Sequence, residues 1–344
     1  MKNPSTLLSL GKNAVLVICC MIAIQCVHAQ TDPHFTQNYT YPMYINPAMT
    51  GSSDGAYRVS AVYRSQWGSL GNPYRTTGIS FDARTNENIA LGVNVMNQSA
   101  GEGGFNYFNA YASIAYTGVK LGKNDEHCIV FAMQAGLINR HVDPTKFKWG
   151  EQWNTITGYS ASNPTTEAFN TTSATTLDMG TGVLYYDASP SKNANVFGGI
   201  SFFHINKPAD PIVATQAVEL NTIPMRYTIH GGVSLNLSDG LTIVPHALFM
   251  HQGNAREIMA GVYLQKQVNE ETGIMVGSYY RYQDAIAPFL GFDYKNLLVG
   301  VSYDANTSKL GSMAKNINSF ELSFTYTKRD GTKSIFDFIH CPRL

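Results

Sequence analysis

Apolar and polar residues alternate with a period of two along most of this sequence, and that alternation limits the folds it can adopt. Successive side chains of a β-strand point to opposite faces of a sheet. The segment 55–68, GAYRVSAVYRSQWG, therefore predicts a strand with one apolar face and one face that carries two arginines. Its alternating sets are Tyr57, Val59, Ala61 and Tyr63 against Arg58, Ser60, Val62 and Arg64. Helical spacing is nearly absent, and 212–221 is the one short candidate helix.

The same alternation predicts 14 strands. We expect them at 56–67, 75–85, 88–98, 105–120, 127–141, 176–187, 195–206, 225–237, 241–252, 257–268, 273–283, 285–294, 297–306 and 319–329. Odd-numbered connections include the two long ones, 142–175 and 207–224, whereas even-numbered connections are short. Bacterial outer-membrane barrels have an even strand count, short periplasmic turns and longer outer loops. The expected fold is therefore all-β: a 14-stranded antiparallel transmembrane β-barrel of the outer membrane, with both termini periplasmic.

Charge and composition agree with a membrane-embedded sheet. Charged residues make up 14% of the chain, against roughly 25% in soluble proteins. Lipid satisfies no backbone hydrogen bond, so a sheet in a membrane must close on itself. Opposite charges in a narrow lumen would pair, which favours a plugged interior over an open pore. The charges expected to point inward are Arg58, Arg64, Asp82, Arg84, Asp178, Arg281, Asp293 and Glu321. A soluble β-sandwich is the alternative fold, because its strands also alternate apolar and polar residues.

The N-terminus resembles an export signal. A positively charged start precedes the apolar run 14–24, and Val27-x-Ala29 fits a small-residue cleavage site. A signal peptide at 1–29 is therefore predicted, with cleavage after Ala29; lipidation at Cys26 is the alternative. Eleven apolar residues are too few for a membrane-spanning helix. The zero formal net charge gives no indication of a nucleic-acid partner.

The rest of the chain divides into three parts by the same reasoning: a lead-in at 30–54, a barrel at 55–329 and a periplasmic tail at 330–344. Asn46-Pro47 favours a turn, and Pro47 is incompatible with a central strand. The lead-in is therefore expected to be ordered without being a strand, in the periplasm or in the lumen. It would act either as a plug or contact for periplasmic machinery, or as a simple cap on the barrel base.

Three short blocks resemble the start of the PorP/SprF family of type IX secretion system membrane proteins: INPAMTG at 45–51, YRSQW at 63–67 and SFD at 80–82. The strand GVNVMNQSAG, the loop FKWGEQ and the terminal CPRL are also similar. The motif residues, expected to have structural roles, are Asn46, Pro47, Ala48, Gly51, Tyr63, Arg64, Gln66 and Trp67.

That resemblance implies an outer-membrane barrel of Bacteroidota-type bacteria, associated with type IX secretion and gliding motility. It implies a role in export or cell-surface anchoring of a large adhesin with a type B C-terminal domain. The implied partners are such an adhesin, type IX components in the periplasm and outer-membrane lipid. An outer-membrane porin or small-solute channel is the alternative function.

No pattern in the chain predicts catalysis, a cofactor or a metal site. Ser312 to Lys315 fits S-x-x-K but lacks the S-D-N and K-T-G partners of serine acyl enzymes. His246 and His251 are five apart with no carboxylate between them. Metalloprotease, P-loop, dinucleotide, hydrolase and EF-hand spacings are absent. An outer-membrane lipase or protease would need a catalytic cluster that these residues do not supply, so we expect no enzyme.

Two further groups are candidate interaction sites. Phe147, Trp149 and Trp153 lie in the long connection 142–175, and aromatic residues are favoured at binding hot spots. They are predicted to bind a partner; packing over the barrel mouth is the alternative. Cys128 and Cys341 remain after signal cleavage, and they form either one disulfide or two unrelated thiols.

Overall fold

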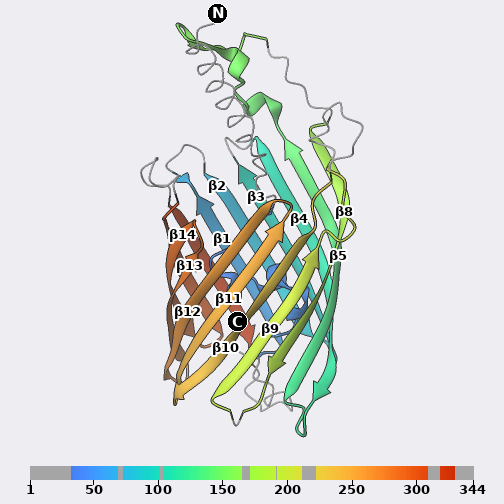
Figure 1. Cartoon of the computed structure of the whole chain (residues 1–344), viewed down its shortest axis with the longest axis vertical. Coiled ribbons are helices and arrows are strands. Elements are labelled where there is room, and N and C mark those ends of the chain that lie inside the picture. The colour runs from blue at the N-terminus through green and yellow to red at the C-terminus, as the bar shows by residue number, and fades with distance from the viewer. Residues whose placement is uncertain are drawn as a thin grey trace, which may run out of the picture.

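Fourteen strands close into one antiparallel barrel in the computed structural model, which describes residues 32–68, 73–100, 104–164, 171–190, 192–210, 222–308 and 318–329 (Figure 1). The barrel strands are β1 (Tyr57–Gln66), β2 (Tyr74–Arg84), β3 (Ile89–Ala100), β4 (Phe105–Leu121), β5 (His127–Val142), β8 (Ser173–Asp187), β9 (Ala194–Phe203), β10 (Arg226–Ser238), β11 (Leu241–Gln252), β12 (Ala255–Asn269), β13 (Thr272–Arg281), β14 (Ala285–Tyr294), β15 (Leu297–Asn306) and β16 (Ser319–Lys328). The predicted 14-stranded antiparallel barrel is confirmed, and every strand bound lies within three residues of its expected position. The candidate helix 212–221 lies outside the described residues.

Pairing of the first and last strands closes the sheet. β1 pairs with β16 in a continuous antiparallel register from Tyr57↔Lys328 to Gln66↔Ser319. The other neighbours are consecutive along the chain, except that β5 pairs directly with β8. Because no edge strand remains in a closed barrel, the soluble β-sandwich considered from the sequence is excluded.

The two ends of the barrel differ in their connections. One end, termed the turn end, carries the short connections 85–88, 122–126, 188–193, 239–240, 270–271 and 295–296. The other, termed the loop end, carries the long connections 143–172 and 204–225. It lies at the top of Figure 1. The two ends match the alternation of connection lengths that the sequence predicts.

Strand alternation places apolar side chains outside the barrel and polar ones inside. Val59 and Tyr63 are exposed on the outer wall, whereas Arg58 and Arg64 of the same strand are buried. The other charges predicted to face inward are also buried, except Arg84, which is half-buried. The lipid-facing and lumen-facing sides of β1 are therefore those that the alternation indicates.

The barrel lumen is filled by the described part of the lead-in, residues 32–54, which is termed the plug. It forms three single-turn elements: η1 (Asn38–Thr40), α2 (Pro42–Ile45) and η2 (Pro47–Met49). Nearly every plug residue is buried, and the plug appears in blue inside the barrel in Figure 1. Aromatic packing joins it to the wall, because the Tyr39 ring lies 5.4 Å from that of Phe289.

Among the described residues, no helix is both long and apolar enough to cross a bilayer.

A small folded segment extends past the loop end. It comprises η4 (Pro144–Lys146), η5 (Gly150–Gln152) and a two-stranded hairpin of β6 (Trp153–Asn154) and β7 (Gly158–Tyr159). We term residues 143–164 the arm. It is the green segment above the barrel in Figure 1, clear of the strand ends.

Candidate functional site

The plug runs lengthwise through the barrel, from the loop end to the turn end. At its start, the backbone N–H of Asp32 donates to the side chain of Gln252, the last residue of β11, at 3.1 Å. At its finish, the Asp54 carboxylate accepts from Arg329, just past the end of β16, at 3.0 Å. The same segment is therefore bound to the barrel at both ends of the lumen.

Glu321 of β16 binds the backbone of the plug. Its carboxylate accepts from the N–H groups of Thr36 and Gln37 at 2.9 and 2.6 Å. Arg64 of β1 donates to the same carboxylate at 3.0 Å. An isolated buried carboxylate is costly, but one with several charge-assisted donors is not. Glu321 is fully buried, so these three donors are what makes its charge tolerable.

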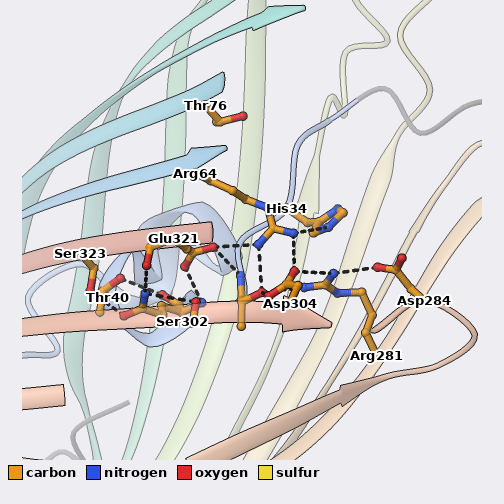
Figure 2. A network of polar contacts seen from close by, with 12 residues as sticks. His34, Thr40, Arg64, Thr76, Arg281, Asp284, Ser302, Asp304, Glu321 and Ser323 are labelled. Atoms are coloured by element: carbon orange, nitrogen blue, oxygen red, sulfur yellow. Dashed lines mark hydrogen bonds and ion pairs between the residues drawn. The ribbon is translucent and has the colours of Figure 1, made fainter. Parts of the chain in front are cut away.

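A polar network joins three barrel strands through one plug hydroxyl (Figure 2). Thr36 Oγ1 accepts from Arg64 at 2.9 Å and from Arg281 at 2.7 Å, and it donates to Asp304 at 2.8 Å. Both guanidinium groups also contact Asp304 directly, at 2.6 and 3.2 Å. The Thr36 hydroxyl therefore makes every hydrogen bond available to it, two as acceptor and one as donor. The predicted pairing of inward charges occurs here, with the plug at its centre.

A second charged cluster holds the start of the plug. His204 follows β9 at the loop end, and its two ring nitrogens lie 2.9 Å from Asp32 and 2.9 Å from Asp178. Burial opposes a charge on this ring, but the two carboxylates outweigh burial and raise the pKa of His204 to about 9. Arg226 lies 2.9 Å from Asp32. Despite burial, His204 and Arg226 hold the pKa of Asp32 well below its usual range.

His34 is the neutral histidine of the plug. Its Nε2 lies 3.3 Å from an Arg64 nitrogen, and arginine can only donate, so this nitrogen must accept. The ring proton is therefore on Nδ1, which faces Glu257 of β12 at 3.4 Å. Burial, together with the charges of Arg281 and Arg64, lowers the pKa of His34 well below its usual value.

Asn46 of the first motif block packs against the inner wall where two glycines, Gly182 and Gly199, leave space for its side chain. Its side-chain NH₂ donates to the carbonyl of Val183 at 3.0 Å and lies 3.1 Å from His230 Nε2. A Cβ at Gly182 would stand 2.0 Å from Asn46 Oδ1, and one at Gly199 would stand 2.6 Å from Nδ2. Only glycine leaves room for the asparagine at these two wall positions.

The neighbouring motif residues shape the turn that follows. Asn46 Oδ1 accepts from the N–H of Ala48 at 2.9 Å, which caps η2, and Pro47 begins that turn. Gly51 has a φ of 71°, and its N–H donates to Asp82 at 2.8 Å. Asp82 also binds Arg58 at 2.9 Å. The motif thus turns the chain from the plug toward β1.

The second motif block, YRSQW, contributes one residue to each of several environments. Tyr63 is on the outer wall and Arg64 is in the network described above. Gln66 is buried at the loop end. Trp67 has a φ of 58°, which is rare for a bulky residue, and its ring lies 5.2 Å from that of Tyr74.

The three candidate partner-binding aromatics all lie in the arm, away from the plug. The rings of Phe147 and Trp149 are 5.5 Å apart, and both side chains are half-buried. Trp153 is 58% exposed and Ile156, at the hairpin tip, is 92% exposed. The structure brings Phe147 and Trp149 together and leaves Trp153 open beside an apolar tip.

The residues weighed for other chemistry are scattered. Cys128 is buried at the turn end, near the start of β5, whereas Cys341 and the Ser312–Lys315 motif lie outside the described residues. His246 has ring contacts with Tyr279 on the inner face, and His251 stacks on Tyr227 on the outer face. An odd separation on one strand puts the two histidines on opposite faces.

Several residues that join the plug to the barrel wall, on either side of that contact, were not identified from the sequence. Asp304 and Glu257 have the inward parity of their strands, so alternation contained a signal for both. Thr36, Gln37 and His204 lie in irregular segments, where no period reveals which way a side chain points.

Comparisons with known proteins agree with this architecture. The model of the type IX secretion system membrane protein PorP/SprF family matches residues 27–326. Among solved structures, the Ralstonia pickettii toluene transporter TbuX has a TM-score of 0.50 at 12% identity, covering 84% of this chain and 93% of that chain. The CymD monoaromatic hydrocarbon channel has a TM-score of 0.48 at 11% identity, covering 85% and 93%. At such identities the likeness to TbuX shows the fold alone. A search of curated proteins found no match.

Proposed function

Because the chain belongs to the PorP/SprF family of type IX secretion system membrane proteins, we propose that it supports export or cell-surface anchoring of a large adhesin with a type B C-terminal domain. The plugged lumen is the observation that carries this proposal. A lumen filled by a segment with buried ion pairs is better suited to holding a partner than to passing solutes. The role is non-enzymatic and contributes to gliding motility.

The orientation follows from the same proposal. The fold and the family support a location in the outer membrane. We assign the loop end to the cell exterior and the turn end to the periplasm, because outer-membrane barrels have their short turns on the periplasmic side. The signal peptide is cleaved after Ala29, and the tail 330–344 lies in the periplasm with access to type IX components.

The arm is the proposed contact for the adhesin. Its tip combines Trp153 and Ile156, two large apolar side chains that are more than half exposed. Exposed apolar groups on a projecting segment favour a protein partner. Phe147 and Trp149 precede the hairpin and pack against each other.

Deleting residues 155–175 tests this contact. The barrel should still assemble, because β8 loses only its first three residues and the rest of the strand, from Thr176 to Asp187, keeps its pairing with β5. The adhesin retained on the cell surface should fall. Trp153→Ala with Ile156→Ser is the finer variant. Ile205→Ser, at a 40% exposed site of the other long connection, is the matched control. Unchanged adhesin display in both arm variants would move the contact away from the arm.

The porin or small-solute channel remains the second candidate, and conductance in planar bilayers distinguishes it. An anchoring barrel with its plug in place should show no steady conductance. Steady single-channel openings of the unaltered protein would favour the channel instead.

A further inference from the structure

A cavity of about 390 Å³, lined by charged and aromatic residues among others, opens at the loop end of the barrel. Its lining includes the start of the plug, Asp32 to His34, together with residues at the loop ends of β1, β2, β3, β12 and β13. The cavity is separate from the arm and from the wall position where Asn46 lies against Gly182 and Gly199. None of the motif-based predictions assigns it a ligand.

Glu257 lines this cavity as a buried carboxylate that lacks good donors. Its side chain is only 4% exposed. The nearest donors are His34 Nδ1 at 3.4 Å and Arg281 Nε at 3.5 Å. Neither carboxylate oxygen has a hydrogen-bond partner within the described parts of the chain. Buried polar groups are nearly always satisfied, so a missing donor at a cavity indicates a ligand position.

The charge balance of the lining favours a cationic ligand. Its carboxylates are Asp32, Glu257 and Asp284, against two guanidinium groups, Arg256 and Arg281. Asp32 is already paired with Arg226 and His204, and Arg281 with Asp304. Asp284 accepts from Arg281 at 2.7 Å and its side chain is 38% exposed. Arg256 is exposed and has the outward parity of β12, opposite to that of Glu257. The negative charge inside the cavity is therefore that of Glu257, whose contact with Arg281 is long, and Asp284 at the rim is open to a second donor.

Aromatic rings line the same cavity. Tyr74 and Tyr282 are 37% and 49% exposed, and the Trp67 ring packs edge-on against Tyr74. Cations are attracted to the faces of such rings. Trp67 also has a positive φ of 58°, and backbone strain of this kind clusters at ligand sites.

We propose that this cavity binds an organic cation, an ammonium or guanidinium group that donates to Glu257 and Asp284 and rests against the aromatic rings. The cation comes either from a free polyamine or from a basic side chain of a polypeptide. The proposal does not depend on the adhesin, so its test and that of the arm can fail separately.

Calorimetric titration of the purified full chain in detergent micelles provides the test. The probes are N-acetyl-arginine amide, its uncharged isostere N-acetyl-citrulline amide, spermidine and maltotriose. The arginine amide should bind at least about tenfold more tightly than the citrulline amide, and its affinity should fall as salt increases. Glu257→Gln should weaken it about tenfold or more. Glu271→Gln is the matched control, because Glu271 is 57% exposed at the turn end, 3.8 Å from Lys295.

Asp284→Asn provides a second variant at a half-exposed position and should weaken the arginine amide several-fold even if Glu257→Gln fails to fold. Tighter binding of spermidine than of the arginine amide would indicate a free polyamine, and the reverse a basic side chain; either supports the proposal. Equal affinities for the charged and uncharged amides, absence of binding by both cations, or preferential binding of maltotriose would overturn it.

Discussion

Arg64 of β1 binds Asp304 of β15 at 2.6 Å, although β16 lies between these two strands in the barrel. The contact is made inside the lumen, over the inner face of β16, and it also includes Thr36 of the plug. One arginine thus connects the first strand, the penultimate strand and the segment inside them.

Arg64→Met should destabilise the barrel strongly. It leaves Glu321 and Asp304 buried without their shared partner, and removing one member of a buried ion pair costs about 3–5 kcal/mol. The temperature at which the folded, fast-migrating form disappears in gel electrophoresis measures the effect. Arg75→Met, at an exposed position near the start of β2, should change little. Similar losses in both variants would contradict a special role for Arg64.

Gly182→Ala and Gly199→Ala should displace Asn46. The added Cβ would stand 2.0 or 2.6 Å from its amide, and overpacking of this kind costs about 1–3 kcal/mol. Gly198→Ala is the control on the same strand, because its Cβ would meet its nearest atom at 3.3 Å. Urea unfolding in detergent should separate the two sites from the control. In the Gly182→Ala background, Asn46→Ala should then cost less than it does alone.

Ala61→Arg places a charge on the lipid face. Such changes cost about 2–4 kcal/mol near mid-membrane, so assembly should fall. From alternation alone, Ser60→Arg in the lumen would be milder. The plug changes that expectation, because Ser60 is 1% exposed and an arginine has no room there. The better control is Asp239→Arg in an exposed turn. Normal assembly of Ala61→Arg would contradict the lipid-facing assignment.

The free energy of unfolding should decrease at alkaline pH, because His204 loses the charge that binds the start of the plug. The pKa of His204 is raised to about 9 in the folded protein, against about 6.5 when unfolded. Its contribution is therefore complete below pH 6.5 and is lost as pH rises through 9. The loss is on the order of 3 kcal/mol. Free energies of unfolding measured from pH 6 to 10 should show this slope, and His204→Gln should flatten it. A parallel slope in that variant would contradict the assignment.

The sequence-based disulfide between Cys128 and Cys341 stays a prediction. Cys128 lies at the turn end, the end from which β16 leads into the tail. A crosslink of this type typically contributes about 2–4 kcal/mol. Mass mapping of non-reduced and reduced protein from native membranes should find the two cysteine peptides linked. Two free thiols there would refute the disulfide.

Alternation identified the barrel because closure in lipid requires a period of two on every strand. Arg58 and Arg64 could be assigned to the lumen for that reason. Alternation could not predict where the plug lies, because its helical turns are only three or four residues long and show no periodic pattern. It also could not show that Asn46 needs Gly182 and Gly199, because that fit joins residues more than 130 positions apart.

The order of the chain has a consequence for how this barrel assembles. Glu321 belongs to the last strand, yet it binds the backbone of Thr36 and Gln37, residues 285 and 284 positions earlier. Contacts so distant along the chain form late. The β1–β16 seam lies beside those contacts, so closure of the seam and binding of the plug by Glu321 would belong to the same late step. The plug would then act as the template on which the final seam is joined, and a chain without it would be expected to stall as an open sheet.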